Sequence, residues 1–466
     1  MRCRRRCWRM CVRFSELDGA RVGVWGAGRE IASFADQLAR RLPSARIVVA
    51  AFDAQPPGDV LDTLRAPAAR VVTGMDVVAA LAECELVVRS PGVSIHRPEM
   101  LALREAGVLV TTATSLWLSE RGGGGVIGVT GTKGKSTTAA LVSHLARAAG
   151  RTAQLAGNIG VPALDLLDAE RAEVTVVELS SFHIADLQVG PEVALVTNLF
   201  REHADWHGSE ESYRAEKLRI LELVGVRMGV INARDAQLMG AVAASIERER
   251  PEGPIETRLF GAPGGWDVID GAVALAGVPV AAISELPLRG EHNALNLCGA
   301  LTALEALEVS PPPLPESLNG FEALSHRLEL VLERDGVLWV NDSISTTPES
   351  TLAALASFPG REIVLIGGGQ DRGQDYAQLG RVLAAGATTV IGVPSTGARL
   401  IAAARDAGAP GARAIAAADM LEAVTLARAV ARPGAVVLLS PAAPSYDHYR
   451  DFEQRGARFG ELAARV

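Results

Sequence analysis

Lysine is nearly absent from this chain. Of the 46 basic residues only three are lysines, Lys133, Lys135 and Lys217, and all the others are arginines. A lysine carries a primary amine, whereas an arginine carries a planar guanidinium that stays charged, so the two side chains support different chemistry. A chain that uses arginine almost everywhere is expected to keep lysine where the amine itself is needed.

Other shortages argue against whole classes of protein. The formal net charge of −8 argues against a general nucleic-acid-binding surface. No apolar run reaches the roughly 20 residues that a membrane-spanning helix needs, and the basic first residues lack the apolar segment of a signal peptide. Two of the five cysteines, Cys84 and Cys298, stand in apolar surroundings typical of a core. We expect a cytoplasmic, monomeric protein with neither a nucleic-acid nor a membrane partner.

The most informative stretch is a glycine-rich loop between an apolar run that begins at Val126 and a helical pattern over residues 138–149. Backbone N–H groups of such a loop, together with a helix N-terminus, bind phosphates; a lysine reaches the terminal phosphates and a serine hydroxyl can hold Mg²⁺. The sequence therefore predicts an ATP site formed by Gly131, Thr132, Lys133, Gly134, Lys135, Ser136 and Thr137.

Apolar strand patterns alternate with helical patterns along the whole chain. Strands are predicted at residues 21–25, 46–52, 85–89, 108–111, 174–179, 193–197, 337–340, 363–366, 389–393 and 435–439. This alternation is typical of mostly parallel sheets flanked by helices. We predict an α/β fold of three domains: residues 1–122, a central P-loop ATPase domain at 123–323, and a Rossmann-like domain at 324–466.

Polar residues follow several of these strands, where open parallel sheets usually bind ligands. Glu178 ends a strand beside the predicted loop and is a candidate Mg²⁺ ligand, and His203 follows the next strand. Nearer the start, Gly26 and Gly28 open a helix that could hold a diphosphate, and Ser90-Pro91-Gly92 follows a strand. Each of these could equally be an ordinary turn or cap.

Together these motifs resemble the Mur ligase family over nearly the whole chain. Besides the glycine-rich loop, the motifs are Gly157-Asn158-Ile159-Gly160, Glu178-Leu179-Ser180-Ser181-Phe182, Glu202-His203 with Asp205, Lys217, His292-Asn293, His326-Arg327, Asn341-Asp342-Ser343 and Leu439-Ser440-Pro441. Their order and number make a chance match negligible.

The resemblance implies a role for each candidate residue. Lys135, Lys217, His203 and Asn158 would take part in catalysis, and Ser136, Glu178, His203 and Lys217 would hold Mg²⁺, Lys217 as a carbamate. Asn293, Asn296, Arg327 and Asp342 would contact ATP in addition to the loop. Substrate contacts would come from Gly26, Gly28, Ser90, Pro91, Gly92, Asn158, Ser181, Thr346, Arg372, Ser445, Tyr446 and Phe452. The carbamate suits the lysine count, because arginine does not readily form one.

The resemblance is greatest to the branch of the family that adds glutamate to UDP-N-acetylmuramoyl-L-alanine in peptidoglycan precursor synthesis. Ligases of this branch that use D-glutamate usually carry Asp-Ser-Lys-x-Thr, where this chain has Asp342-Ser343-Ile344-Ser345-Thr346. A positive charge is thus replaced by a hydrocarbon, and we expect L-glutamate to be the substrate. The alternatives are the same ligation with D-glutamate, a folylpolyglutamate synthetase-like ligase, and an ATP-operated switch that joins no substrates.

Overall fold

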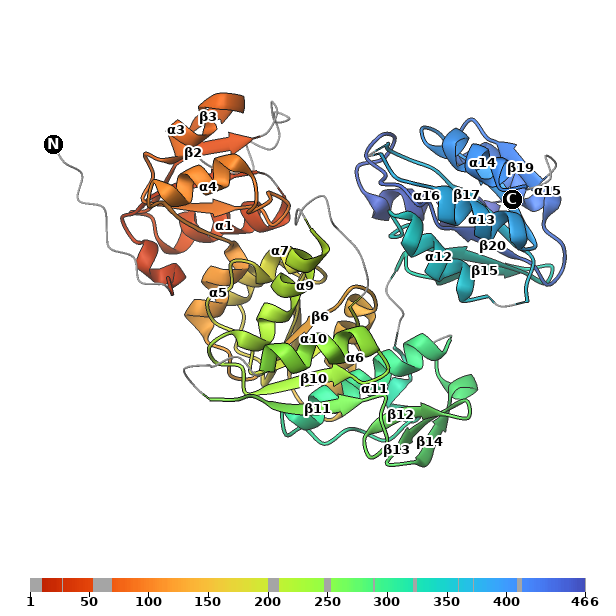
Figure 1. Cartoon of the computed structure of the whole chain (residues 1–466), viewed down its shortest axis with the longest axis horizontal. Coiled ribbons are helices and arrows are strands. Elements are labelled where there is room, and N and C mark those ends of the chain that lie inside the picture. The colour runs from red at the N-terminus through yellow and green to blue at the C-terminus, as the bar shows by residue number, and fades with distance from the viewer. Residues whose placement is uncertain are drawn as a thin grey trace. The chain divides into compact units, whose positions relative to one another are not determined.

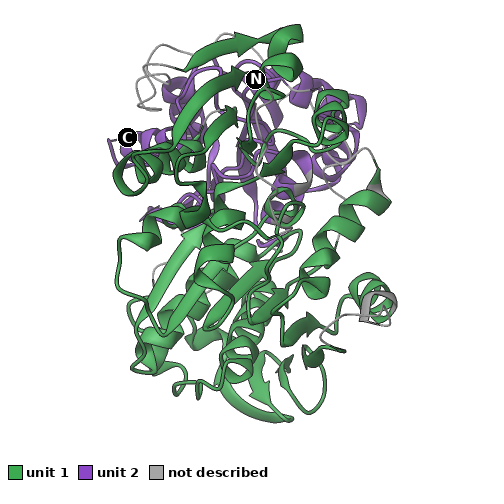
Figure 2. Ribbon diagram, turned by 90° about the vertical axis from the view of Figure 1, so that its left-hand side faces the viewer, with its two compact units in different colours: residues 1–321 green, residues 322–466 purple. Residues whose placement is uncertain are grey.

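The computed structural model describes residues 11–26, 28–52, 69–199, 209–246, 253–287, 290–321, 325–358, 360–371, 373–408 and 413–465. The chain divides into two compact units, residues 1–321 and residues 322–466 (Figure 2). The first unit contains two parallel sheets and a small antiparallel sheet, and the second contains one mostly parallel sheet.

The first sheet has five parallel strands in the order β3-β2-β1-β4-β5, and Figure 1 shows its strands β2 and β3 with helices α1, α3 and α4. Its strands are β1 (Arg21–Trp25), β2 (Arg46–Phe52), β3 (Arg70–Thr73), β4 (Leu86–Arg89) and β5 (Leu109–Thr111). Its helical segments are η1 (Phe14–Leu17), α1 (Arg29–Arg41), η2 (Gly74–Asp76), α3 (Val77–Leu81), α4 (Pro98–Glu105) and α5 (Ala113–Arg121). The strand order reverses between β1 and β4, so the loops that follow these two strands meet at the carboxyl edge.

The second sheet has six parallel strands in the order β11-β10-β9-β6-β8-β7. Its strands are β6 (Val126–Thr130), β7 (Ala153–Gly157), β8 (Val174–Glu178), β9 (Val193–Val196), β10 (Met228–Asn232) and β11 (Glu256–Phe260). Its helical segments are α6 (Lys135–Ala148), η3 (Ala163–Leu167), α7 (Ser181–Ile184), α9 (Glu210–Leu218), η4 (Arg219–Glu222), α10 (Ala236–Ile246), η5 (Ile283–Glu285), α11 (Glu291–Ala306) and η6 (Glu316–Leu318). Because β6 pairs with both β8 and β9, the glycine-rich loop lies between the ends of these strands.

Two features of the first unit differ from the sequence prediction. An antiparallel sheet of β12 (Trp266–Ile269), β13 (Ala272–Leu275) and β14 (Val278–Ala282) was not predicted. Helix α6 begins at Lys135, three residues before the predicted start, so the helix N-terminus is part of the glycine-rich loop. Cys84 and Cys298 are both buried, as predicted.

The second unit contains a six-stranded sheet in the order β15-β16-β20-β17-β18-β19, parallel except for β15 at one edge. The strands are β15 (Glu329–Arg334), β16 (Val337–Asn341), β17 (Ile363–Gly367), β18 (Thr388–Gly392), β19 (Ala414–Ala416) and β20 (Val436–Leu439). The helices are α12 (Pro348–Ala356), α13 (Ala377–Ala385), α14 (Gly397–Asp406), α15 (Met420–Val430) and α16 (Phe452–Arg465). The predicted α/β class, with mostly parallel sheets and flanking helices, is confirmed.

The predicted boundary after residue 323 lies two residues from the division between the units. The predicted boundary after residue 122 lies inside the first unit, between its two parallel sheets. There the chain is tightly packed, since a Cβ atom on Gly123 would lie 2.4 Å from the carbonyl oxygen of Gly190. The division into three domains stays a proposal. Over the residues described, no helix has the length and apolar character of a membrane span.

Candidate active site

Two glycines allow the loop after β6 to pass close to its neighbours. Gly134, the N-cap of α6, has a left-handed backbone with φ of 79°, and a Cβ atom there would lie 2.4 Å from Oδ1 of Asn296. Gly131 has φ of 144°, and a Cβ atom there would lie 1.9 Å from Oγ1 of Thr197. Any other residue at either position would strain the backbone and displace a neighbouring side chain.

Residues just after β9 hold the loop in place. The backbone N–H of Lys133 donates to Oδ1 of Asn198 at 2.7 Å, and that of Thr132 donates to the carbonyl oxygen of Asn198 at 3.0 Å. The hydroxyl of Thr197 donates to the carbonyl oxygen of Lys133 at 2.6 Å. The sequence analysis did not identify Thr197 and Asn198 as loop partners, although polar residues directly after an apolar strand were the available signal.

All three lysines of the chain lie in this loop or contact it. Nζ of Lys135 donates to the carbonyl oxygen of Thr132 at 2.9 Å, and Nζ of Lys217, on α9, donates to that of Gly131 at 2.8 Å. Lys217 is buried, with its amine 4.8 Å from the ring centroid of Tyr213. The hydroxyl of Tyr213 in turn forms a 2.8 Å hydrogen bond with that of Thr132.

Glu178 is fully buried at the end of β8, beside the loop. Its Oε1 accepts a 3.1 Å hydrogen bond from Nδ2 of Asn158, and its Oε2 has no hydrogen-bond partner among the residues described. A buried carboxylate oxygen needs a donor or a cation, and a carboxylate together with a hydroxyl such as that of Ser136 is a donor set that suits Mg²⁺. The site therefore fits the predicted ion.

Two of the predicted site residues, His203 and Arg372, lie outside the described part of the chain. In the described part, no group of three or more His, Cys, Asp or Glu side chains could hold a metal. Of the four predicted Mg²⁺ ligands, only Glu178 is a described residue of one of these four types. Ser136 would bind the ion through its hydroxyl, and Lys217 would bind it only after conversion to a carbamate.

Helix α11 brings two more predicted residues to the loop. Asn296 lies against Gly134, and its Nδ2 donates to Oδ1 of Asn293, one turn earlier, at 3.2 Å. The predicted nucleotide contacts Asn293 and Asn296 are therefore adjacent to the glycine-rich loop, although they follow it by more than 150 residues in the chain.

The first sheet also reaches this region. Arg29, at the start of α1, donates to the carbonyl oxygens of Asn158 at 3.0 Å and Gly160 at 3.2 Å. Gly26 and Gly28, just before α1, have positive φ values, and a Cβ atom on Gly26 would lie 2.9 Å from Cβ of Ser90. Three segments therefore lie close together: the turn after β1, the Ser90-Pro91-Gly92 turn and the loop that contains Asn158.

A buried hydrogen-bonded pair that the sequence analysis missed joins α1 to α7. Oε1 of Glu30 lies 2.6 Å from Nε2 of His183, and Nδ1 of His183 lies 2.6 Å from Oγ of Ser180. Burial alone would raise the pKa of Glu30, but His183 and a hydrogen bond from Thr114 hold that pKa below its ordinary value. Nothing in the sequence relates Glu30 to His183, which are 153 residues apart.

In the second unit, Asp342 is buried directly after β16. Its Oδ2 accepts a 2.8 Å hydrogen bond from the hydroxyl of Ser440, and its Oδ1 accepts one of 3.3 Å from the backbone N–H of Leu328. Burial raises the pKa of Asp342 to about 6, although these hydrogen bonds and the charge of Arg327 oppose the change. Asp342 and Arg327, both predicted to contact nucleotide, are thus electrostatically linked.

Arg455, on α16, organises the loops at the same sheet edge and was not predicted. Its guanidinium is buried and donates to Oγ and the carbonyl oxygen of Ser343 and to the carbonyl oxygen of Ala443. The hydroxyl of Ser343 donates to the carbonyl oxygen of Phe452 at 2.8 Å. The remaining predicted substrate residues lie near these loops in the chain: Thr346 is half-buried, Ser445 is buried and Tyr446 is exposed.

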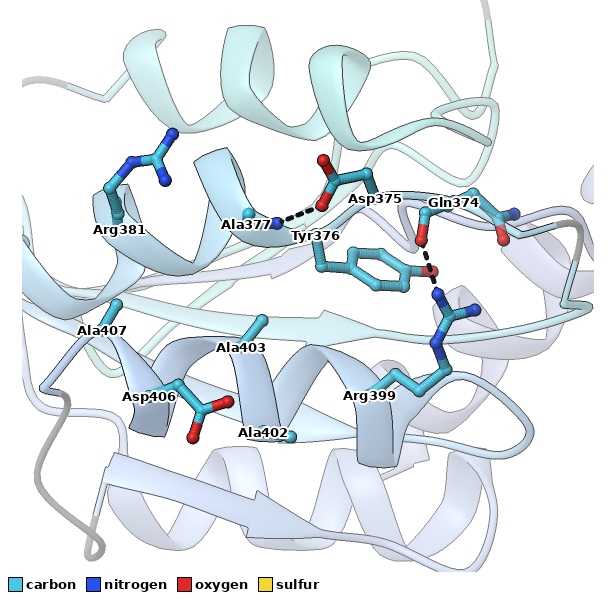
Figure 3. A pocket seen from close by; sticks show the side chains of 10 residues that line it. All are labelled: Gln374, Asp375, Tyr376, Ala377, Arg381, Arg399, Ala402, Ala403, Asp406 and Ala407. Carbon is cyan, nitrogen blue, oxygen red and sulfur yellow. Dashed lines mark hydrogen bonds between the residues drawn. The ribbon is translucent and has the colours of Figure 1, made fainter. Parts of the chain in front are cut away.

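A separate pocket of about 590 Å³ lies between α13 and α14 in the second unit (Figure 3). The phenol ring of Tyr376 lies between the two helices, and Arg399 donates to the carbonyl oxygen of Gln374 at 2.7 Å. None of the predicted site residues that the structure describes lines this pocket.

Comparison with known families agrees with this arrangement. Residues 129–304 match the Mur ligase middle domain, and residues 326–443 match the Mur ligase, glutamate ligase domain. The chain belongs to the Mur ligase family. It is therefore an enzyme, an ATP-dependent ligase that forms an amide bond, so a switch that joins no substrates is not favoured.

Two curated relatives resemble this Mur ligase over nearly its full length. A protein of Micromonospora sp. is 41% identical over 97% of this chain and 98% of its own. A protein of Xanthomonas euvesicatoria is 39% identical over 97% of both chains. Both relatives are named UDP-N-acetylmuramoyl-L-alanine–L-glutamate ligase.

Solved structures support the fold of this Mur ligase. The MurF ligase of Thermotoga maritima in complex with ADP has a TM-score of 0.57 at 18% identity and covers 98% of this chain and 99% of its own. Escherichia coli FolC with ADP has a TM-score of 0.55 at 18% identity but covers only 76% of this chain. Similarity at this level supports the fold of the chain. It does not tell whether the chain acts more like the MurF ligase or more like FolC.

Proposed function

We propose that this Mur ligase joins L-glutamate to UDP-N-acetylmuramoyl-L-alanine at the expense of ATP, in the synthesis of a peptidoglycan precursor. The observation that carries the proposal is the gathering of all three lysines around a glycine-rich loop beside buried Glu178. The printed names of the full-length relatives supply the two substrates. A cytoplasmic location and a monomeric state are parts of the same proposal.

A carboxylate is a poor electrophile, so the reaction needs an activation step. The terminal L-alanine carboxylate attacks the γ-phosphorus of ATP, which forms an acyl phosphate and releases ADP. The amine of glutamate then attacks the acyl carbon, the amide bond forms, the amine loses a proton, and inorganic phosphate leaves. No nucleophilic side chain is required, so catalysis comes mostly from positioning and charge neutralisation.

In this proposal the loop amides and Lys135 bind the phosphates, and Asn158 orients the reacting carboxylate. Glu178 and Ser136 would hold Mg²⁺ together with His203 and a carbamylated Lys217, and the ion would neutralise negative charge on the phosphates. Asn293, Asn296, Arg327 and Asp342 would bind the rest of the nucleotide. The second unit would bind the incoming glutamate.

The choice of L-glutamate rests on the replacement of the usual lysine by Ile344, and on the relatives' names. Ile344 is half-buried two residues after Asp342. Thr346, Arg372, Ser445, Tyr446 and Phe452 would complete the amino-acid pocket. Without the positive charge of the lysine, a carboxylate of the incoming glutamate would bind at a different position, to a group such as Arg372. The pocket would then accept the L enantiomer instead of the D enantiomer.

Phosphate release tests the proposal directly. The purified protein is mixed with ATP, Mg²⁺ and UDP-N-acetylmuramoyl-L-alanine, and either L- or D-glutamate is added. We expect release that needs both substrates and is at least about tenfold faster with the L form. A preference for D-glutamate would reverse the stereochemical assignment and leave the ligase assignment intact. Release without the nucleotide substrate, or with a folate in its place, would overturn the ligation proposed here.

A further inference from the structure

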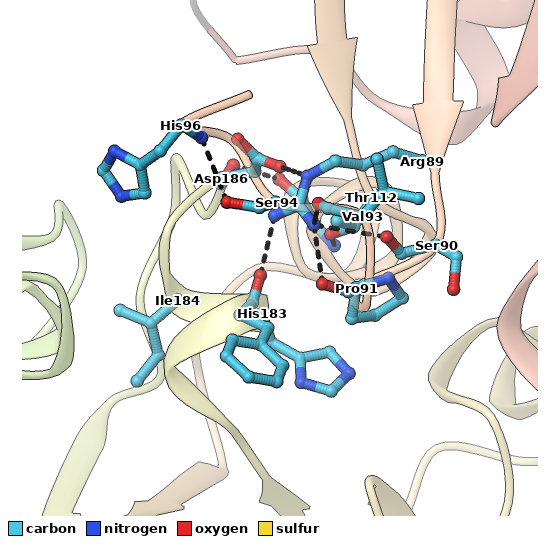
Figure 4. A network of polar contacts seen from close by, with 12 residues as sticks. Arg89, Ser90, Pro91, Val93, Ser94, His96, Thr112, His183, Ile184 and Asp186 are labelled. Carbon is cyan, nitrogen blue, oxygen red and sulfur yellow. Dashed lines mark hydrogen bonds and ion pairs between the residues drawn. The ribbon is translucent and has the colours of Figure 1, made fainter. Parts of the chain in front are cut away.

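Arg89 forms an unusual buried cluster of contacts at the end of β4 (Figure 4). Its side chain is fully buried, and its Nε lies 2.5 Å from Oδ2 of Asp186, which is also buried. Nη1 donates to the carbonyl oxygens of Ser90, Pro91 and Val93, at 3.2, 2.9 and 2.8 Å. A buried guanidinium is costly unless it is paired and hydrogen-bonded, and this one directs three of its hydrogen bonds at a single turn.

The other side of the same guanidinium contacts α7, which belongs to the second sheet. Nη2 of Arg89 donates to the carbonyl oxygen of Phe182 at 2.7 Å. Phe182 lies in α7, a single helical turn (Ser181–Ile184) that begins three residues after Glu178; we call it the Ser181 turn. One side chain therefore joins the Ser90-Pro91-Gly92 turn of the first sheet to the segment that follows the proposed Mg²⁺ ligand.

Arg89 is not the only side chain that joins the regions of the two sheets. The hydroxyl of Ser33 donates to Oδ1 of Asp165 at 2.5 Å, and Nε2 of Gln37 donates to Oδ2 of Asp168 at 2.7 Å. These contacts join α1 to the region of η3 and touch neither turn. If Arg89 served only to hold the sheets together, its contacts would not need to converge on two turns that are both predicted to bind substrate.

We propose that Arg89 is a positioning residue of the ligation reaction. It holds the Ser90-Pro91-Gly92 turn and the Ser181 turn at a fixed separation, so that a nucleotide substrate that contacts both turns presents its carboxylate to the ATP site. This inference rests on the proposed function. A guanidinium is required, because its planar fork donates in several fixed directions, which the point charge of a lysine ammonium does not.

The test compares Arg89→Lys with the parent enzyme in steady-state ligation, well below the melting temperature of either protein. We expect the KM for UDP-N-acetylmuramoyl-L-alanine to rise at least about tenfold, because the two turns lose their common donor. The KM values for ATP and glutamate should stay within about twofold. Asp186→Asn, which keeps the guanidinium but removes its charge partner, should raise the same KM by about threefold.

Gln37→Leu is the matched control, because Gln37 is buried in α1 and also joins a helix of the first sheet to a segment of the second, at Asp168, without contacting either turn. It should lower the melting temperature and leave the KM for the nucleotide substrate within about twofold. The proposal is overturned if Arg89→Lys and Asp186→Asn lower the melting temperature but leave the KM for the nucleotide substrate unchanged. It is also overturned if Gln37→Leu raises this KM as much as Arg89→Lys does. If the parent enzyme does not ligate the two substrates, the proposed function is refuted. If the parent enzyme does ligate them, the KM values of the variants test the role of Arg89 alone.

Discussion

Nζ of Lys217 donates a 2.8 Å hydrogen bond to the carbonyl oxygen of Gly131, although the two residues are 86 positions apart in the chain. The contact places the amine of a buried lysine at the first glycine of the phosphate loop. In a chain with three lysines, all at one loop, this amine is the natural candidate for the proposed carbamate.

Replacement of Lys217 by alanine should reduce ligation by at least about 100-fold, because a metal ligand would be lost. Lys217→Arg should not restore activity, since a guanidinium does not readily form a carbamate. A small carboxylate such as acetate, added to the alanine variant, should recover part of the rate. The test measures the ligation rates of the parent enzyme, Lys217→Ala and Lys217→Arg, each with and without acetate. Near-normal turnover of the arginine variant would remove the carbamate from the mechanism.

Gly134→Ala should weaken nucleotide binding at least about tenfold, because the new Cβ atom would lie 2.4 Å from Oδ1 of Asn296 in a left-handed backbone. Calorimetric titration with ADP measures the effect. Gly150→Ala is the control at the other end of the same helix, where φ is 78° and no atom lies within 4 Å of the added Cβ. The control should lose about 1 kcal/mol of stability and bind ADP normally. Equal loss of affinity in both variants would contradict this account of the loop.

Asp342→Asn should change how stability depends on pH. Burial raises the pKa of Asp342 in the folded state to about 6 from its ordinary value of 3.8, and a pKa difference of one corresponds to about 1.4 kcal/mol. The favourable contribution of the neutral carboxyl is therefore complete below about pH 4 and is lost as the pH rises through 6, by about 3 kcal/mol in all.

The asparagine variant has no carboxyl to ionise, so its stability relative to the parent should rise between pH 4 and pH 7. Melting temperatures of both proteins across that range measure the difference. A difference that stays constant with pH would mean that the Asp342 carboxyl titrates alike in the folded and unfolded states.

Ile344→Lys should raise the ratio of D- to L-glutamate use by about tenfold, since it restores the charge found in ligases that take the D form. Phosphate release with each enantiomer measures the ratio. Leu330→Lys adds the same charge to the same unit at an exposed position on β15 and should leave the ratio unchanged. If the two variants behave alike, Ile344 does not determine the stereochemistry.

Local sequence patterns were sufficient to predict several elements of the first sheet. Strands β1 and β2 have the predicted bounds, because buried parallel strands are continuously apolar, and helix α1 follows the glycine turn that was predicted to open a helix. The antiparallel sheet of β12, β13 and β14 was missed because its strands are short and because β13 and β14 are partly exposed. Helix α6 was predicted to start too late because Lys135 and Ser136, which open it, were assigned to the loop.

The sequence by itself determined the α/β class, the glycine-rich loop between a strand and a helix, and the membership of the Mur ligase family. These depend on residue types at short spacings, which local backbone geometry imposes. Only the tertiary structure decided that Glu30 pairs with His183, that Thr197 and Asn198 hold the loop, and that Arg89 joins two turns from different sheets. Such pairings require elements far apart in the chain to pack together, and no local pattern encodes which buried charges then meet.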